Sequence, residues 1–269
     1  MPKKEITSLH SPQVARVKAL LGSRGKKSRK DTSEFVVDNL QSLISALTNK
    51  DQRFPLLKVL FATTHGLDNL REHGPIDPES IENLEIFIVS EALMRELSDV
   101  ESSVGVLGIC EFSELTLLDI KNYAKKIAYF WQIQDPGNAG TVIRSADASG
   151  FDAVIFSDQS VDIYSPKVVR STVGSLWHIP VIADIALDAA LEFGSEYQFK
   201  LAALDAHGEV LISNYAKSEK IVLIFGNEAR GLPEVSANVE KVKIPMKGRA
   251  ESFNVASAAT IAMYEVGLR

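Results

Sequence analysis

Residues 244–258 read Ile-Pro-Met-Lys-Gly-Arg-Ala-Glu-Ser-Phe-Asn-Val-Ala-Ser-Ala. This pattern predicts the end of a strand, a polar loop, and then a helix that continues to Leu268. Ser252 and Asn254 stand where the helix begins, and side-chain oxygens at such positions accept hydrogen bonds from unpaired backbone N–H groups. The start of a helix also suits an anionic group, because it offers free backbone donors and the positive end of the dipole. Taken alone, the stretch favours an ordinary helix cap, because capping is so common.

Two further stretches change that interpretation. Residues 221–232 read Ile-Val-Leu-Ile-Phe-Gly-Asn-Glu-Ala-Arg-Gly-Leu, and residues 134–144 read Gln-Asp-Pro-Gly-Asn-Ala-Gly-Thr-Val-Ile-Arg. Together, the three stretches resemble the SpoU (TrmH) family of RNA 2′-O-ribose methyltransferases in the SPOUT superfamily, over roughly residues 126–269. The first motif matches at Asn138, Gly140 and Arg144, the second at Gly226, Glu228, Gly231 and Leu232, and the third at Ile244, Pro245, Met246, Ser252, Phe253, Asn254, Val255 and Ala258.

The order of the expected elements indicates an α/β fold. Apolar strands alternate with helices of about ten residues, which is typical of a parallel sheet with crossover connections. The resemblance implies more: a SPOUT-type sheet with a C-terminal trefoil knot, which ordinary folding rules would not suggest. The sequence contains neither Gly-x-Gly nor a Gly-x-x-x-x-Gly-Lys loop, which disfavours a dinucleotide site or a P-loop.

By the resemblance, the methyl donor S-adenosylmethionine is bound by Gly226, Ile244 and Phe253, with Met246 nearby. Glycine lets the backbone approach a ligand closely. The apolar side chains offer surface for an adenine ring, although plain core packing is the alternative for Ile244 and Phe253. Phe253 stands where the family has Leu.

The implied acceptor is a ribose 2′-hydroxyl, with Arg144, Asn138, Glu228, Ser252 and Asn254 as the catalytic set. Because a guanidinium is effectively always protonated, we expect Arg144 to clamp a phosphate and stabilise alkoxide charge rather than act as a base. A salt bridge is the alternative for Arg144. Asn138 is expected to contact substrate or brace the Glu228 loop, with helix capping as its alternative. Glu228 would orient Arg144 or accept a ribose hydrogen bond, with a helix-start carboxylate as its alternative.

The charge distribution favours a nucleic-acid partner despite a net charge of −6. Residues 1–30 hold nine Lys or Arg and one Glu, a net of +8, so the other 239 residues carry −14. Residues 22–30 are rich in Gly and Ser and predict a loop suited to phosphate contacts; a solvated terminus is the alternative. The expected RNA contacts are Arg24, Lys26, Lys27, Arg29 and Lys30, together with Lys167 and Arg170 in a region that also resembles the family.

We expect four parts along the chain. These are a basic arm with a helix (1–30), a smaller substrate-binding α/β domain similar to ribosomal protein L30e (31–112), a linker (113–125) and the catalytic domain (126–269). The L30e resemblance departs at one point, because Val37-Asp38-Asn39 stands where such domains usually have Val-Glu-Gly.

The remaining expectations concern partners and location. Cys110 is the only cysteine, and no signal peptide or run of about 18 apolar residues is evident, so a cytoplasmic protein is expected. The isolated His residues imply no metal. The resemblance and an Ala-rich last helix (Ala256, Ala258, Ala259, Ala262) predict a homodimer through the C-terminal domain. Ribosomal RNA is favoured over transfer RNA by analogy; a non-catalytic RNA-binding scaffold and a small-molecule α/β enzyme are the alternatives.

Overall fold

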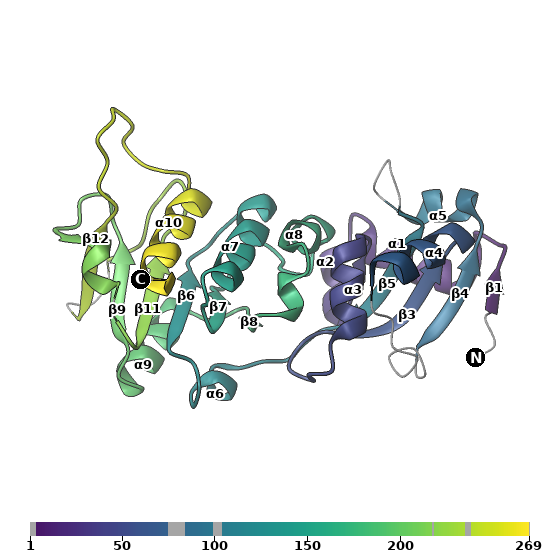
Figure 1. The fold of residues 1–269 in the computed structure, drawn as a ribbon, viewed down its shortest axis with the longest axis horizontal. Helices are drawn as coiled ribbons and strands as arrows, with labels where there is room; N and C mark the ends of the chain where they lie inside the picture. Colours follow the sequence, from purple (N-terminus) through teal and green to yellow (C-terminus); the bar gives the residue numbers. More distant parts are fainter. Residues whose placement is uncertain (1–3, 75–83, 99–103, 217, 235–237, 269) are drawn as a thin grey trace. The chain divides into compact units, whose positions relative to one another are not determined.

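The computed structural model describes residues 4–74, 84–98, 104–216, 218–234 and 238–268. The chain divides into two compact units (Figure 1). Unit 1 comprises residues 1–113 together with 164–178, and unit 2 comprises residues 114–163 and 179–269. The division near residue 113 lies at the start of the expected linker. The segment 164–178, however, groups with the N-terminal residues, although its sequence lies inside the range expected for the catalytic domain.

Unit 1 is built on a mixed five-stranded sheet. Its strands β1, β4 and β3 are parallel, whereas β5 runs antiparallel to both β3 and β2. In spatial order the strands are β1 (Lys4–Ile6), β4 (Glu85–Val89), β3 (Leu56–Ala62), β5 (Val106–Glu111) and β2 (Glu34–Val37). The helices are α1 (Pro12–Leu21), α2 (Gly25–Thr32), α3 (Leu40–Thr48), α4 (Thr64–His73), α5 (Glu91–Leu97), α8 (Pro166–Thr172) and the 3₁₀ turn η2 (Ser175–Trp177).

An aromatic group explains why residues 164–178 belong to unit 1. The ring of Tyr164 stacks on Phe112 with centroids 4.0 Å apart and lies 4.7 Å from Phe35. Trp177 lies 6.2 Å from Phe35, and its indole N–H donates to the carbonyl of Pro55 at 2.9 Å. Buried aromatic side chains contribute much of the packing energy of a small core. Two of the four rings in this core therefore come from the later segment.

The basic stretch 22–30 does not form the predicted loop. Residues 25–32 form α2, and Arg29 is buried with its guanidinium donating to the carbonyl of Leu20 at the end of α1. The Gly and Ser residues misled the prediction because Gly22 and Gly25 serve the tight turn between two helices, where the Gly25 N–H bonds to the Gly22 carbonyl. The expected arm is therefore folded onto unit 1, apart from residues 1–3, which lie outside the described part.

Unit 2 is built on a seven-stranded sheet in which every pair is parallel. The order is β10 (Val210–Leu211), β12 (Val239–Lys243), β9 (Lys200–Leu204), β11 (Ile221–Phe225), β6 (Lys126–Phe130), β7 (Ala153–Phe156) and β8 (Val181–Ile182). The helices are α6 (Leu117–Ile120), α7 (Pro136–Ala148), α9 (Leu187–Glu196), α10 (Val255–Leu268) and the 3₁₀ turn η3 (Ile212–Tyr215).

Both faces of this sheet are covered, as its nearly continuous apolar strands predict. Ile127 and Tyr129 of β6 point into a core with α6 and α9, whereas Phe130 stacks on Phe225 of β11 at 4.7 Å on the other face. Helices α7 and α10 lie next to each other over that second face (Figure 1). The prediction of an α/β fold with a parallel sheet is confirmed, and the trefoil knot stays an expectation of the resemblance.

Two smaller points complete the fold. Residues 232–234 form neither helix nor strand, and residues 235–237 lie outside the described part. Among the helices in the described residues, none has both the length and the apolar character needed to span a bilayer.

Candidate active site

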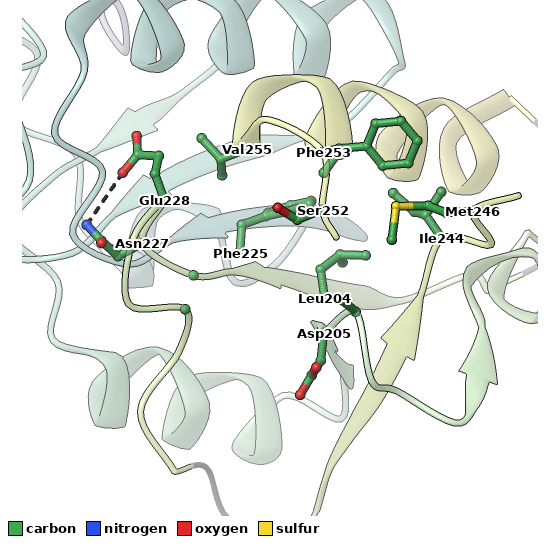
Figure 2. Close-up of a pocket in the computed structure, with 14 residues that line it drawn as sticks. Leu204, Asp205, Phe225, Asn227, Glu228, Ile244, Met246, Ser252, Phe253 and Val255 are labelled. Atoms are coloured by element: carbon green, nitrogen blue, oxygen red, sulfur yellow. Dashed lines mark hydrogen bonds between the residues drawn. The ribbon is translucent and has the colours of Figure 1, made fainter. Parts of the chain in front are cut away.

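A pocket opens at the carboxyl ends of β9, β11 and β12, the edge at which parallel α/β sheets bind ligands. The four predicted donor-site residues all line it, as do Glu228 and Ser252 of the predicted catalytic set. Figure 2 shows Ile244, Met246 and Phe253 gathered on one side and Glu228 on the opposite side. The lining consists of Leu204, Asp205, Ala206, Phe225, Gly226, Asn227, Glu228, Gly231, Ile244, Met246, Ser252, Phe253, Val255 and Ala258.

The loop after β11 forms one wall of the pocket, and two glycines shape it. A Cβ added to Gly226 would lie 2.5 Å from the backbone carbon of Gly231, so no other residue fits without moving the loop. Gly231 has a φ of +66°, a conformation that favours glycine. Asn227 and Gly231 close the turn by exchanging backbone hydrogen bonds of 3.0 and 2.9 Å. The glycines of the second motif are thus required by the turn itself, a reason that the sequence argument did not give.

The apolar wall comes from the third motif. Phe253 is 43% exposed, which excludes plain core packing for that ring. Ile244 and Met246 are half-buried beside it. An exposed phenyl ring flanked by aliphatic side chains in a pocket is suited to a flat apolar ligand such as a nucleobase.

A chain of polar side chains crosses from α7 to α10 beside the pocket. The amide nitrogen of Asn138 donates to Glu228 Oε1 at 3.1 Å, and Asn254 donates to Asn138 Oδ1 at 3.3 Å. Asp135 caps α7 by accepting from the Asn138 N–H at 2.9 Å, so the Asn138 side chain is not itself the cap. Asn138 therefore braces the Glu228 loop, which is one of its two predicted roles. Asn254 does cap α10, since its Oδ1 accepts from the Ala256 N–H at 2.9 Å.

Arg144 stands apart from this cluster. It is exposed on α7, six residues beyond Asn138, which is about 9 Å along a helix axis. In the part of the chain that the structure describes, it makes no hydrogen bond or ion pair and does not line the pocket. The alternative salt bridge is not present there. The orienting contact from Glu228 is not present either, since Glu228 is bonded to Asn138 instead. The guanidinium thus remains available for an external anion.

Two polar residues of the pocket lining, Asp205 and Asn227, were not predicted from the sequence as site residues. Asp205 follows the apolar strand β9 directly, and its Oδ1 accepts from the His207 N–H at 2.8 Å while Oδ2 lies 3.4 Å from Lys241 Nζ. Asn227 is buried in the loop after β11. In both cases the available signal was a polar residue just after a buried parallel strand. Asp205 follows β9 directly, and Asn227 follows β11 after Gly226.

The expected RNA contacts divide into two groups. Arg24, Lys26, Lys27, Lys30 and Lys167 are exposed. The two others serve the fold of unit 1.

Of these two, Arg29 is buried, so the expectation of a surface phosphate contact is wrong for it. The guanidinium of Arg170 donates to Asp38 at 2.7 Å, and the Asp38 side chain is only 3% exposed. Asp38 stands where such domains usually have Glu, so the carboxylate that pairs with α8 is kept on a side chain one methylene shorter. An RNA contact by Arg170 stays a prediction.

Comparisons with known proteins find RNA methyltransferases of similar sequence and fold. The chain is 28% identical over 267 residues to the 23S rRNA (guanosine(2553)-2′-O)-methyltransferase RlmP of Bacillus subtilis, covering 98% of this chain and 99% of that protein. The fold matches the AdoMet-bound rRNA methyltransferase from Sinorhizobium meliloti with a TM-score of 0.81 at 28% identity, over 98% and 97% of the two chains.

A second solved structure is the SpoU methyltransferase AviRb from Streptomyces viridochromogenes in complex with AdoMet. It matches with a TM-score of 0.80 at 25% identity, over 96% of this chain and 98% of that one. The model of the SpoU rRNA Methylase family matches residues 125–264, just over half of the chain. The chain therefore belongs to the SpoU rRNA Methylase family.

Proposed function

We propose that this protein transfers a methyl group from S-adenosylmethionine to a ribose 2′-hydroxyl in ribosomal RNA. One observation carries the proposal: an apolar pocket at the sheet edge is lined by Gly226, Ile244, Met246 and Phe253, and a polar cluster stands at its side. The AdoMet complexes of two structural neighbours and the rRNA specificity named for the relatives support it.

When bound, S-adenosylmethionine supplies an electrophilic methyl group, and the chain must position the ribose oxygen and stabilise its charge. We assign acceptor positioning to Asn138, Glu228, Ser252 and Asn254, which provide hydrogen-bond donors and acceptors at the pocket. Arg144 has a permanent charge and no partner within the described residues. Its proposed role is to bind the phosphate next to the target ribose and to stabilise the developing alkoxide.

Exposed lysines and arginine supply the proposed RNA docking surface. Arg24, Lys26, Lys27 and Lys30 lie on or next to α2 of unit 1, and Lys167 lies on α8. Phosphate contacts of this kind fix the position of an RNA without reading its sequence. We therefore propose unit 1 as the substrate-binding domain and unit 2 as the catalytic domain, in a cytoplasmic enzyme.

The homodimer also stays a proposal, with a revised physical basis. Ala256, Ala259 and Ala262 are buried within unit 2, so they do not offer the expected surface for a second chain. The exposed side of α10 carries Ile261 at 39% and Tyr264 at 52% exposure instead. These apolar side chains support an interface on α10. A monomeric mass by light scattering at micromolar concentration would contradict it.

The function is tested by incubating the purified protein with labelled S-adenosylmethionine and unmodified ribosomal RNA, followed by digestion to nucleosides and mass spectrometry. The proposal predicts label in a 2′-O-methylnucleoside. Label on a base would contradict it. The alternative of a non-catalytic scaffold predicts RNA binding without product, and calorimetric titration of the donor separates the two.

A further inference from the structure

The side chain of Asn227 is buried at 7% exposure, and each of its polar atoms is used. Its Oδ1 accepts from the N–H groups of Ala229 and Arg230 at 3.0 and 3.1 Å, which shapes the turn. Its Nδ2 donates to the carbonyl of Gln132 at 2.7 Å and lies 3.4 Å from Glu228 Oε2, the interaction drawn dashed in Figure 2. One amide thus ties the turn to the neighbouring strand end and to the carboxylate of the polar cluster.

The partner of this amide is held firmly. Gln132 follows β6 in a left-handed conformation with a φ of +49°. Its N–H donates to Ser157 Oγ at 2.7 Å, just beyond β7, and its Oε1 accepts from Arg230 at 3.2 Å. Ser157 is 1% exposed. A strained conformation persists only where its surroundings hold it, so Gln132 gives Asn227 a fixed anchor.

These hydrogen bonds form a continuous path along the carboxyl edge of the sheet. From Ser157 it passes through Gln132 and Asn227 to Glu228, and from there through Asn138 and Asn254 to α10. Resting on the proposed methyl transfer, we propose that Asn227 is a positioning residue that aims Glu228 at the acceptor side while its loop lines the donor pocket. Only an amide fits this place, because it must accept from two N–H groups and donate to a carbonyl and a carboxylate.

The decisive variant is Asn227→Asp. It keeps an oxygen for the N–H groups of Ala229 and Arg230, but it places an oxygen against the Gln132 carbonyl and the Glu228 carboxylate. We expect kcat to fall about tenfold or more near pH 8.5, because the donated hydrogen bonds become repulsions. The KM for the donor should change less than about threefold, since the turn is retained. Asn227→Ala removes the acceptor too and should also weaken donor binding.

The pH dependence separates positioning from simple damage. Charged groups lie on the elements that meet at this edge: Glu228 and Arg230 on the same loop, Asp205 in the same pocket lining, Asp135 at the start of α7 and Asp158 after β7. The second oxygen of the new carboxyl would face the Gln132 carbonyl and the Glu228 carboxylate, 2.7 and 3.4 Å from the present amide nitrogen. Together with burial, these two groups favour the protonated form against the opposing effect of the Ala229 and Arg230 N–H groups. Once protonated, that carboxyl can donate to the Gln132 carbonyl. The ratio of variant to wild-type kcat should therefore rise at least about threefold between about pH 8.5 and about pH 6.

Asn214→Asp, at an exposed asparagine of η3, is the matched control and should keep a constant ratio near one. A ratio for Asn227→Asp that stays low at every pH, or an activity equal to wild type throughout, would overturn the assignment. The wild-type enzyme in the same assay distinguishes the two proposals: absence of 2′-O-methyl product there contradicts the function, whereas product there with no recovery in the variant contradicts only the role of Asn227.

Discussion

The polar side chains of unit 1 and those at the sheet edge of unit 2 are used differently. In unit 1, the Asp38 carboxylate is buried against Arg170, and Arg29 is buried against a backbone carbonyl. At the sheet edge of unit 2, Asn138 and Glu228 are bonded to each other near the surface, with one further bond each to Asn254 and Asn227, and Arg144 is exposed. The first set is placed to hold a fold, and the second has hydrogen-bonding capacity left for a ligand. Burial and saturation therefore separate the polar residues that hold the fold from those that can still bind a ligand; the buried Asn227 is proposed to act only through Glu228.

The sharpest test of this contrast is Arg144→Ala. We expect methyl transfer to fall by about a thousandfold, the order of effect seen when a charge-stabilising group is removed from an active site. Donor affinity should stay within about twofold, because Arg144 does not line the pocket. Activity and calorimetric donor binding on the same preparation check both. An equal fall of the two would show that Arg144 supports the donor pocket.

Arg170→Ala tests the structural side of the contrast. Removing the guanidinium breaks the ion pair with the buried Asp38 carboxylate, so we expect the free energy of unfolding to fall by about 3 kcal/mol. Denaturant unfolding measures this change. Lys167→Ala, at an exposed residue of the same helix, is the control and should change it by less than about 0.5 kcal/mol. If RNA affinity falls in Arg170→Ala while stability is unchanged, Arg170 belongs with the functional set.

A smaller effect is expected for Phe253→Ala. Its exposed ring forms part of the apolar wall, and removing an aromatic ring on which a base stacks costs about 1–3 kcal/mol. Donor affinity should therefore fall about tenfold, with little change in the unfolding free energy. Phe253→Leu, which restores the residue of the family motif, should recover most of the affinity. Unchanged donor binding in Phe253→Ala would exclude stacking on this ring.

The smallest effect concerns α2. Replacing Arg24, Lys26, Lys27 and Lys30 with Ala should weaken RNA binding and reduce the log–log salt slope by about 0.7–0.9 for each phosphate that the variant no longer binds. Donor binding should be unaffected. RNA affinity across a salt series measures the slope. An unchanged slope would place the RNA surface elsewhere.

Local signals and family motifs could be predicted from the sequence, whereas contacts that depend on tertiary packing could not. Ser11-Pro12 and Ser90 are local capping signals that can be recognised in the sequence, and they stand at the starts of α1 and α5. The motifs also placed Gly226, Ile244, Met246 and Phe253 in one pocket. The burial of Arg29 and the Asp38–Arg170 pair were not predictable, since the first depends on how α1 and α2 pack. The second joins residues 132 positions apart, for which a single sequence carries no signal.

The central claim is that the donor binds at the carboxyl edge of the parallel sheet, between the turn after β11 and the start of α10. Hydrogen–deuterium exchange with and without S-adenosylhomocysteine, the product form of the donor, tests this most directly. The account predicts slower exchange on addition of this ligand in peptides covering residues 204–206, 226–231 and 244–255, and no change in α3 or β5 of unit 1. Protection confined to unit 1, or absent from the turn at residues 226–231, would contradict the account.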